Sequence, residues 1–174
     1  MHFQSGSNYI YIHDMKRFPI FDGHNDTLTA LYLPEYAKGR TLFEESNFGH
    51  IDIPRARRGG LAGGFFAICT PPPESSPERD PFYGLTMTSD GYDHEYPPAL
   101  NTKYTRQFTD SIIDFAFGLE KQSNGELKII RNYTELEWCL ENNVMAAVLH
   151  IEGAEPIKDD LSNLEDYYLK GIRS

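Results

Sequence analysis

Three side chains able to bind a divalent metal lie at alternate positions near the start of the chain. Asp22, His24 and Asp26 follow the apolar pair Ile20-Phe21, which is typical of a short buried strand. Side chains on a strand alternate between its faces, so these three are predicted to point the same way. An imidazole and a carboxylate that converge at a strand end suit a transition metal. The alternative is a turn shaped by the acidic residues, in which His24 is incidental.

A second pair of such side chains follows another apolar run. Residues 144–149 are predicted to form a buried strand that leads into His150 and Glu152. Alternation places these two side chains on one face. Because ligands in parallel α/β folds bind at the carboxyl ends of strands, Glu152 is predicted to join the same site. His150 is a candidate for contact with metal or substrate.

Helices and strands alternate along the rest of the chain. The predicted order is a strand that contains Ile20-Phe21, helix 27–36, helix 52–60, strand 61–70, helix 101–122, extended segment 127–130, helix 134–142, strand 144–151, helix 162–171 and the start of a strand at 172–174. Asp52, Thr134 and Ser162 are the predicted N-caps of three of these helices. This alternation favours an α/β fold with a parallel sheet, either open or closed into a barrel.

The sequence allows more than one interpretation of three further segments. Residues 71–98 form an insertion rich in Pro, Ser, Asp and Tyr, which is typical of a functional or disordered loop. Its His94 is predicted to be a solvated loop residue. Gly63-Gly64 is predicted to admit a close backbone or ligand. The arginines of helix 52–60 are predicted to oppose the helix dipole, and binding of a substrate carboxylate is the alternative.

Composition narrows the class of protein. The 174 residues suit one domain, residues 18–174, after a poorly ordered lead-in at 1–17. A net charge of −10 argues against nucleic-acid binding. There is no apolar run of membrane-spanning length and no signal-peptide pattern, so a cytoplasmic location is expected. Cys69 and Cys139 lie in apolar runs and are predicted to be buried free thiols.

Three blocks of sequence resemble a known family. The segment Phe21-Asp22-Gly23-His24-Asn25-Asp26 resembles the first-strand motif of the renal (membrane) dipeptidase family of zinc metallopeptidases, peptidase family M19, in its bacterial branch. Residues 50–66 and 149–155 are similar to two further blocks of that family, in the same order. The resemblance covers the chain from about residue 17 to its end.

The resemblance implies the N-terminal half of a (β/α)8 TIM-like barrel, with about four βα units. It implies two zinc ions and hydrolysis of dipeptides, with tolerance of D-residues at the C-terminal position. His24 and Asp26 would then bind one zinc ion, Glu152 would bridge both, and Asp22 would orient a ligand or cap the turn. The family's other zinc and catalytic residues have no counterpart here, so the chain alone is expected to be nearly inactive.

Two alternatives remain from the sequence. The chain could be a non-catalytic half-barrel that associates with a second copy or with a complementary C-terminal half, because an open half-barrel exposes sheet edges. Another amidohydrolase class is less well supported, since those enzymes usually carry His-x-His on the first strand and this chain has His24-Asn25-Asp26.

Overall fold

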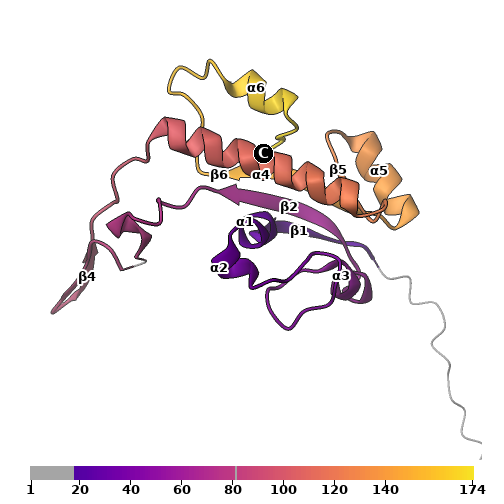
Figure 1. The fold of residues 1–174 in the computed structure, drawn as a ribbon, viewed down its shortest axis with the longest axis horizontal. Coiled ribbons are helices and arrows are strands. Elements are labelled where there is room, and N and C mark those ends of the chain that lie inside the picture. Colours follow the sequence, from indigo (N-terminus) through magenta and orange to yellow (C-terminus); the bar gives the residue numbers. More distant parts are fainter. Residues whose placement is uncertain (1–17, 81) are drawn as a thin grey trace, which may run out of the picture.

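A computed structural model describes residues 18–80 and 82–174 (Figure 1), so the predicted lead-in at 1–17 lies outside the described residues. A four-stranded parallel sheet has the order β1-β2-β6-β5. Its strands are β1 (Ile20–Asn25), β2 (Leu61–Cys69), β5 (Leu127–Ile129) and β6 (Met145–Glu152). The predicted α/β class with a parallel sheet is therefore confirmed.

Strand β6 is the strand around which the later chain assembles. One edge of β6 pairs with β2, and the other pairs first with β5 and then, through Leu149, with Ile172. The sequence predicted only an extended segment at β5, whereas Leu127 and Ile129 are buried members of the sheet. The predicted start of a strand near the chain end is confirmed by the bridge at Ile172.

Helices cover the sheet and bury its apolar residues. They are α1 (Thr27–Tyr32), α2 (Pro34–Ala37), α3 (Ile53–Gly59), α4 (Thr102–Gln122), α5 (Tyr133–Asn142) and α6 (Leu164–Leu169). Figure 1 shows α4 running along the sheet, where Ile112 and Leu119 join Phe66 and Leu149 in the main core. Within the described parts of the chain, no helix combines the length and apolarity needed to cross a bilayer.

Both capping boxes predicted for the later helices are wrong. Helix α5 begins after Asn132, whose side chain accepts a hydrogen bond from the Glu135 N–H at 3.0 Å, so this Asn precedes the predicted cap Thr134. Helix α6 begins after Asn163, not Ser162. Leu164 and Tyr168 of this helix are exposed, whereas Tyr167 is buried.

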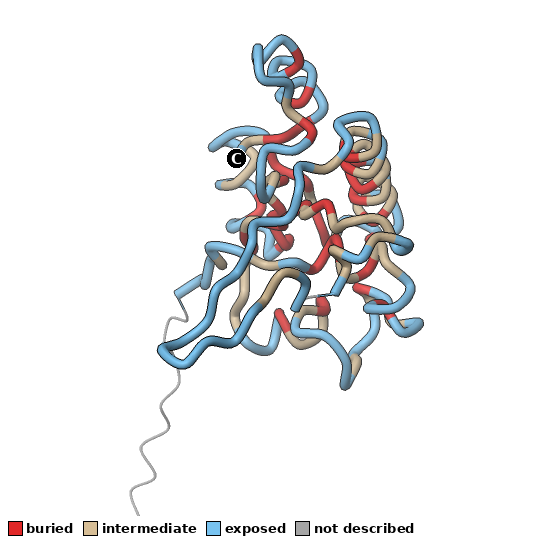
Figure 2. Tube along the Cα trace, turned by 90° about the vertical axis from the view of Figure 1, so that its left-hand side faces the viewer, coloured by how far each residue is buried: buried red, intermediate tan, exposed pale blue. Residues whose placement is uncertain are grey.

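The insertion at 71–98 contains ordered structure. After a 3-10 turn, η1 (Pro77–Arg79), strands β3 (Leu85–Thr88) and β4 (Gly91–His94) form an antiparallel hairpin. Figure 1 shows this hairpin projecting away from the sheet, and Figure 2 shows that it is exposed along its length. His94 is exposed, as predicted.

The glycine pair of β2 lets three strands approach closely. A Cβ atom added to Gly64 would lie 2.8 Å from Cβ of Asp22, and one added to Gly63 would lie 2.9 Å from Cβ of Ala146. Both distances are too short for carbon atoms in contact. The predicted close approach is therefore a contact between backbones, and it sets the position of β1 against β2.

Candidate metal centre

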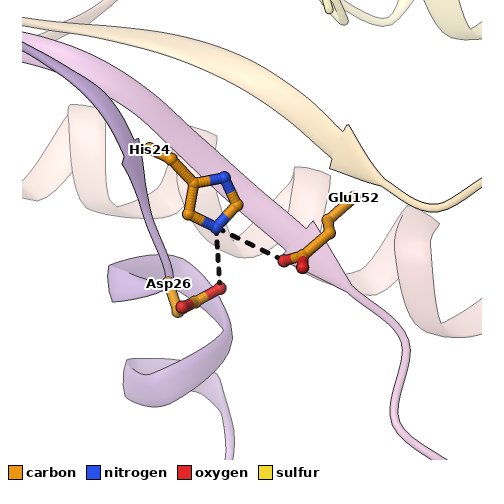
Figure 3. A group of neighbouring side chains, drawn as sticks. All are labelled: His24, Asp26 and Glu152. Atoms are coloured by element: carbon orange, nitrogen blue, oxygen red, sulfur yellow. Dashed lines mark ion pairs between the residues drawn. The ribbon is translucent and has the colours of Figure 1, made fainter.

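His24, Asp26 and Glu152 converge at the carboxyl ends of β1 and β6 (Figure 3). One ligand atom from each lies within 4.8 Å of the other two. The His24 Nε2 atom is 3.5 Å from Asp26 Oδ1 and 3.4 Å from Glu152 Oε2. His24 and Asp26 are far from Glu152 in the sequence, and the structure brings all three side chains together.

The spacing of these atoms fits a metal better than it fits direct hydrogen bonds. Nitrogen-to-oxygen hydrogen bonds are usually about 2.7–3.2 Å long, so both distances from His24 are too long. Ligand atoms placed about 2.0–2.2 Å from a tetrahedral zinc ion lie roughly 3.4 Å from one another. One imidazole and two carboxylates are also a donor set that zinc accepts. The residues present therefore fit such an ion.

Asn25 shapes the turn that delivers two of these side chains. Its Nδ2 donates to Asp22 Oδ2 at 3.0 Å and to the Phe65 carbonyl oxygen at 3.2 Å, and its Oδ1 accepts from the Thr27 N–H. The pairing of β1 with β2 is irregular between Asp22 and Asn25, and Asp26 is the N-cap residue of α1. The prediction that strand alternation sets the direction of the Asp26 side chain is therefore wrong. Strand β1 ends at Asn25, and Asp26 already caps the following helix.

Two candidate residues lie beside the group of three but outside it. The carboxylate of Asp22 accepts a hydrogen bond from Asn25 Nδ2, and its role in orienting a ligand or capping the turn stays a prediction. The ring of His150 meets the rings of His24 and Phe65 edge to face, with centroids 5.4 and 6.2 Å apart. Its Nδ1 lies 3.1 Å from the Ser174 hydroxyl oxygen. His150 thus contacts a candidate ligand rather than completing the donor set.

Cys69 lies opposite Glu152 in the β2–β6 pairing. Its thiol is free and half-buried, whereas Cys139 is fully buried, so the predicted burial holds for Cys139 alone. Burial raises the pKa of Cys69 to about 11, and the charges of Glu152, Glu155 and Asp26 add to this shift. The thiol is therefore protonated at neutral pH.

Together the fold and this cluster define a class: a parallel α/β protein with a candidate metal centre at the ends of its strands. The chain belongs to the membrane dipeptidase family, peptidase family M19, whose family model matches residues 13–174. Members of this family are metal-dependent peptidases. The predicted family is thereby confirmed.

Several relatives match along most of this chain. An uncharacterized protein in the PQQ-III 3′ region of Acinetobacter calcoaceticus is 29% identical over 164 residues, which are 91% of this chain and 48% of that protein. Among solved structures, the dipeptidase AC of family M19 is 30% identical with a TM-score of 0.69, covering 89% of this chain and 41% of its own.

A second solved structure was determined with a ligand. The metallopeptidase from Rhodobacter sphaeroides, bound to a phosphinate mimic of the dipeptide L-Ala-D-Ala, is 28% identical with a TM-score of 0.71. The match covers 89% of this chain and 44% of that one. The chain thus spans about half the length, or less, of the relatives it matches.

Proposed function

We propose that residues 18–174 form the N-terminal half of a (β/α)8 TIM-type barrel, with about four βα units, in a zinc-dependent dipeptidase. The observation that carries this proposal is the meeting of His24, Asp26 and Glu152 at the carboxyl ends of parallel strands. That edge is where barrel enzymes place their active sites. Membership of a dipeptidase family and the two solved relatives support the same activity.

Each of the three side chains has a distinct role in this proposal. Nε2 of His24 and a carboxylate oxygen of Asp26 would hold one ion. Glu152 has two oxygens and would link the positions of both ions. When bound, zinc lowers the pKa of a water molecule and polarises the scissile carbonyl. The three residues position the ions and move no proton themselves.

The substrate class follows from a relative. The Rhodobacter sphaeroides protein binds a mimic of L-Ala-D-Ala, which supports dipeptides, including those with a C-terminal D-residue, as substrates of the complete enzyme. Three ligands shared by two ions leave the second ion with few donors. The 174-residue polypeptide by itself is therefore expected to bind zinc weakly and to turn over little L-Ala-D-Ala.

Zinc binding tests the proposal directly. Equilibrium dialysis followed by metal analysis should show zinc bound to the wild-type chain, with a dissociation constant raised at least about tenfold in H24A and in E152Q. Glu155→Gln is the matched control, because Glu155 is exposed and lies three residues beyond Glu152. Equal losses in Glu155→Gln, or no specific zinc binding by the wild-type chain, would contradict the assigned site.

A second candidate function has its own support. Strand β1 pairs only with β2 among the described strands, and Ile20 of this edge strand is 54% exposed. Exposed edge strands favour pairing with another chain. The chain would then act as a non-catalytic module that associates with a second copy or with a complementary C-terminal half. Its mass in solution and the coding DNA beyond Ser174 distinguish the two candidates.

A further inference from the structure

We infer that the cavity beside the metal centre binds an acidic side chain of the substrate and that Arg40 selects it. The assignment of a dipeptide as the ligand rests on the proposed function. The cavity itself is a property of this chain alone. The substrate class inferred is peptides that contain a glutamate or a similar residue. Arg40, the specificity residue, lies outside the group of metal ligands.

The cavity is lined by both acidic and basic side chains. Its volume is about 590 Å³, which is within the range of small-ligand sites. Asp22, His24 and Asp26 line the end at the metal centre. Arg40 and His50, from the loop between α2 and α3, line the cavity as well. An acidic group of a ligand would be repelled by the carboxylates of Asp22 and Asp26 and attracted by Arg40.

Arg40 is a half-buried cation without an acidic partner. Across residues 18–80 and 82–174, its side chain donates one hydrogen bond, from Nη1 to the Ile51 carbonyl oxygen at 3.0 Å, and no carboxylate oxygen lies within salt-bridge distance of it. Its Nε is buried and has no partner among the same residues. Burial lowers the pKa of Arg40, and the charge of Arg55 lowers it further against the opposing effect of Asp52. A bound carboxylate would relieve this cost.

The arginines first considered for this role are engaged elsewhere. Arg55, Arg57 and Arg58 of α3 form ion pairs with Asp52, Glu126 and Glu45, respectively. The buried carboxylate of Asp52 therefore pairs with Arg55. Arg40, Arg55 and Asp52 together carry a net positive charge.

The rest of the cavity and the whole-chain charge limit what can bind. Ala30, Tyr36 and Ile51 supply apolar surface along the lining, which suits the methylene groups of a side chain that ends in a carboxylate. The chain as a whole carries a charge of −10. The negative net charge of the chain would therefore repel acidic ligands. A preference for an acidic ligand requires a local cation such as Arg40.

The test compares two dipeptides of nearly equal shape. Ala-Glu and Ala-Gln are titrated into the 174-residue chain in the presence of a chelator, and binding is followed by calorimetry. Ala-Glu should bind about tenfold more tightly. R40Q should remove this difference, and R40K should retain part of it. The control Arg57→Gln removes an arginine that pairs with Glu126 and lines a different cavity, so it should keep the full ratio.

The two proposals fail in different ways. Equal binding of Ala-Glu and Ala-Gln by the wild-type chain would overturn the inference without the use of any variant. Weaker binding of both dipeptides to R40Q, with their ratio unchanged, would reassign Arg40 to the terminal carboxylate and also overturn it. Zinc binding is measured on the same samples without chelator. If the chain prefers Ala-Glu but binds no zinc, the inference about the acidic side chain stands and the proposed metal centre is contradicted.

Discussion

At the scale of single residues, Cys69 shows how one side chain responds to its acidic neighbours. Its pKa of about 11 reflects burial first and then the nearby carboxylates. A thiol reacts as its thiolate, and an ordinary cysteine has a pKa of about 8.5. At pH 8 the thiolate fraction of Cys69 is therefore on the order of a hundredfold smaller than that of an ordinary thiol.

We predict slow alkylation of Cys69. Its rate with iodoacetamide at pH 8 should be about a hundredfold below that of a small-molecule thiol, and it should rise about tenfold per pH unit toward pH 11. Peptide mapping by mass spectrometry separates it from the buried Cys139. A rate at pH 8 equal to that of the free thiol would contradict the assigned environment.

The candidate functional residues differ in how readily they could be predicted from the sequence. His24, Asp26 and Glu152 could be predicted because metal-binding types recur at strand ends. Arg40 could not be predicted. It is a candidate because it has no acidic partner among the described residues, and this depends on how the arginines of α3 pair with the nearby carboxylates. Asn25 was also missed, although an amide side chain at the end of a strand is a common turn residue.

At the scale of elements, α3 shows a helix whose limits are encoded locally. Asp52 Oδ1 accepts from the Arg55 N–H at 2.9 Å, and its Oδ2 accepts from the Ser46 N–H and from Arg55 Nε. Gly60 ends the helix with a φ of +80°. The sequence predicted both ends because each signal lies within a few residues of the helix.

We predict that D52A destabilises the fold by about 2–4 kcal/mol, because it removes a helix cap and leaves Arg55 without its buried partner. Burial raises the pKa of Asp52, but hydrogen bonds from Arg55 and Ser46 outweigh it and lower the net pKa below 3.8. The folded state thus favours the charged form. The resulting stability is present above pH 3.8 and is lost as the pH falls further.

Urea unfolding at several pH values measures this effect. The wild-type chain should lose stability below pH 4 more steeply than D52A, and the conservative variant D52N should fall between them at pH 7. Identical pH profiles for the wild-type chain and D52A would show that Asp52 contributes no charge-dependent stability.

The later helices show where local signals are insufficient. Around α5, Asn132 and Thr134 are both acceptable caps, and Asn132 is the one used. Arg173 Nε donates to the Arg131 carbonyl oxygen, which fixes the chain just before that cap from a distant part of the sequence. Around α6, Asn163 bonds to the backbone of Pro156 and Lys158. Contacts of this kind cannot be read from a short window.

At the scale of the whole molecule, β1 is an edge strand among the described residues, and exposed edges favour association. We predict concentration-dependent association, measured by sedimentation equilibrium. I20K places a charge beside the open edge and should weaken association at least about tenfold. Y96K is the control, because Tyr96 is 95% exposed in the insertion. A monomer at every concentration, with one sharp unfolding transition, would count against an association module.

The distance along the chain between the metal-binding residues has a consequence for folding. Asp26 and Glu152 are roughly 125 residues apart, so bringing them together closes a long loop and costs conformational entropy. In the sheet, β2 lies between β1 and β6, the strands that lead into these residues. Within the candidate centre, His24 and Asp26 are therefore close in the sequence, whereas Glu152 joins them only through the fold. A metal ion that binds all three residues would therefore stabilise the folded topology relative to the unfolded chain.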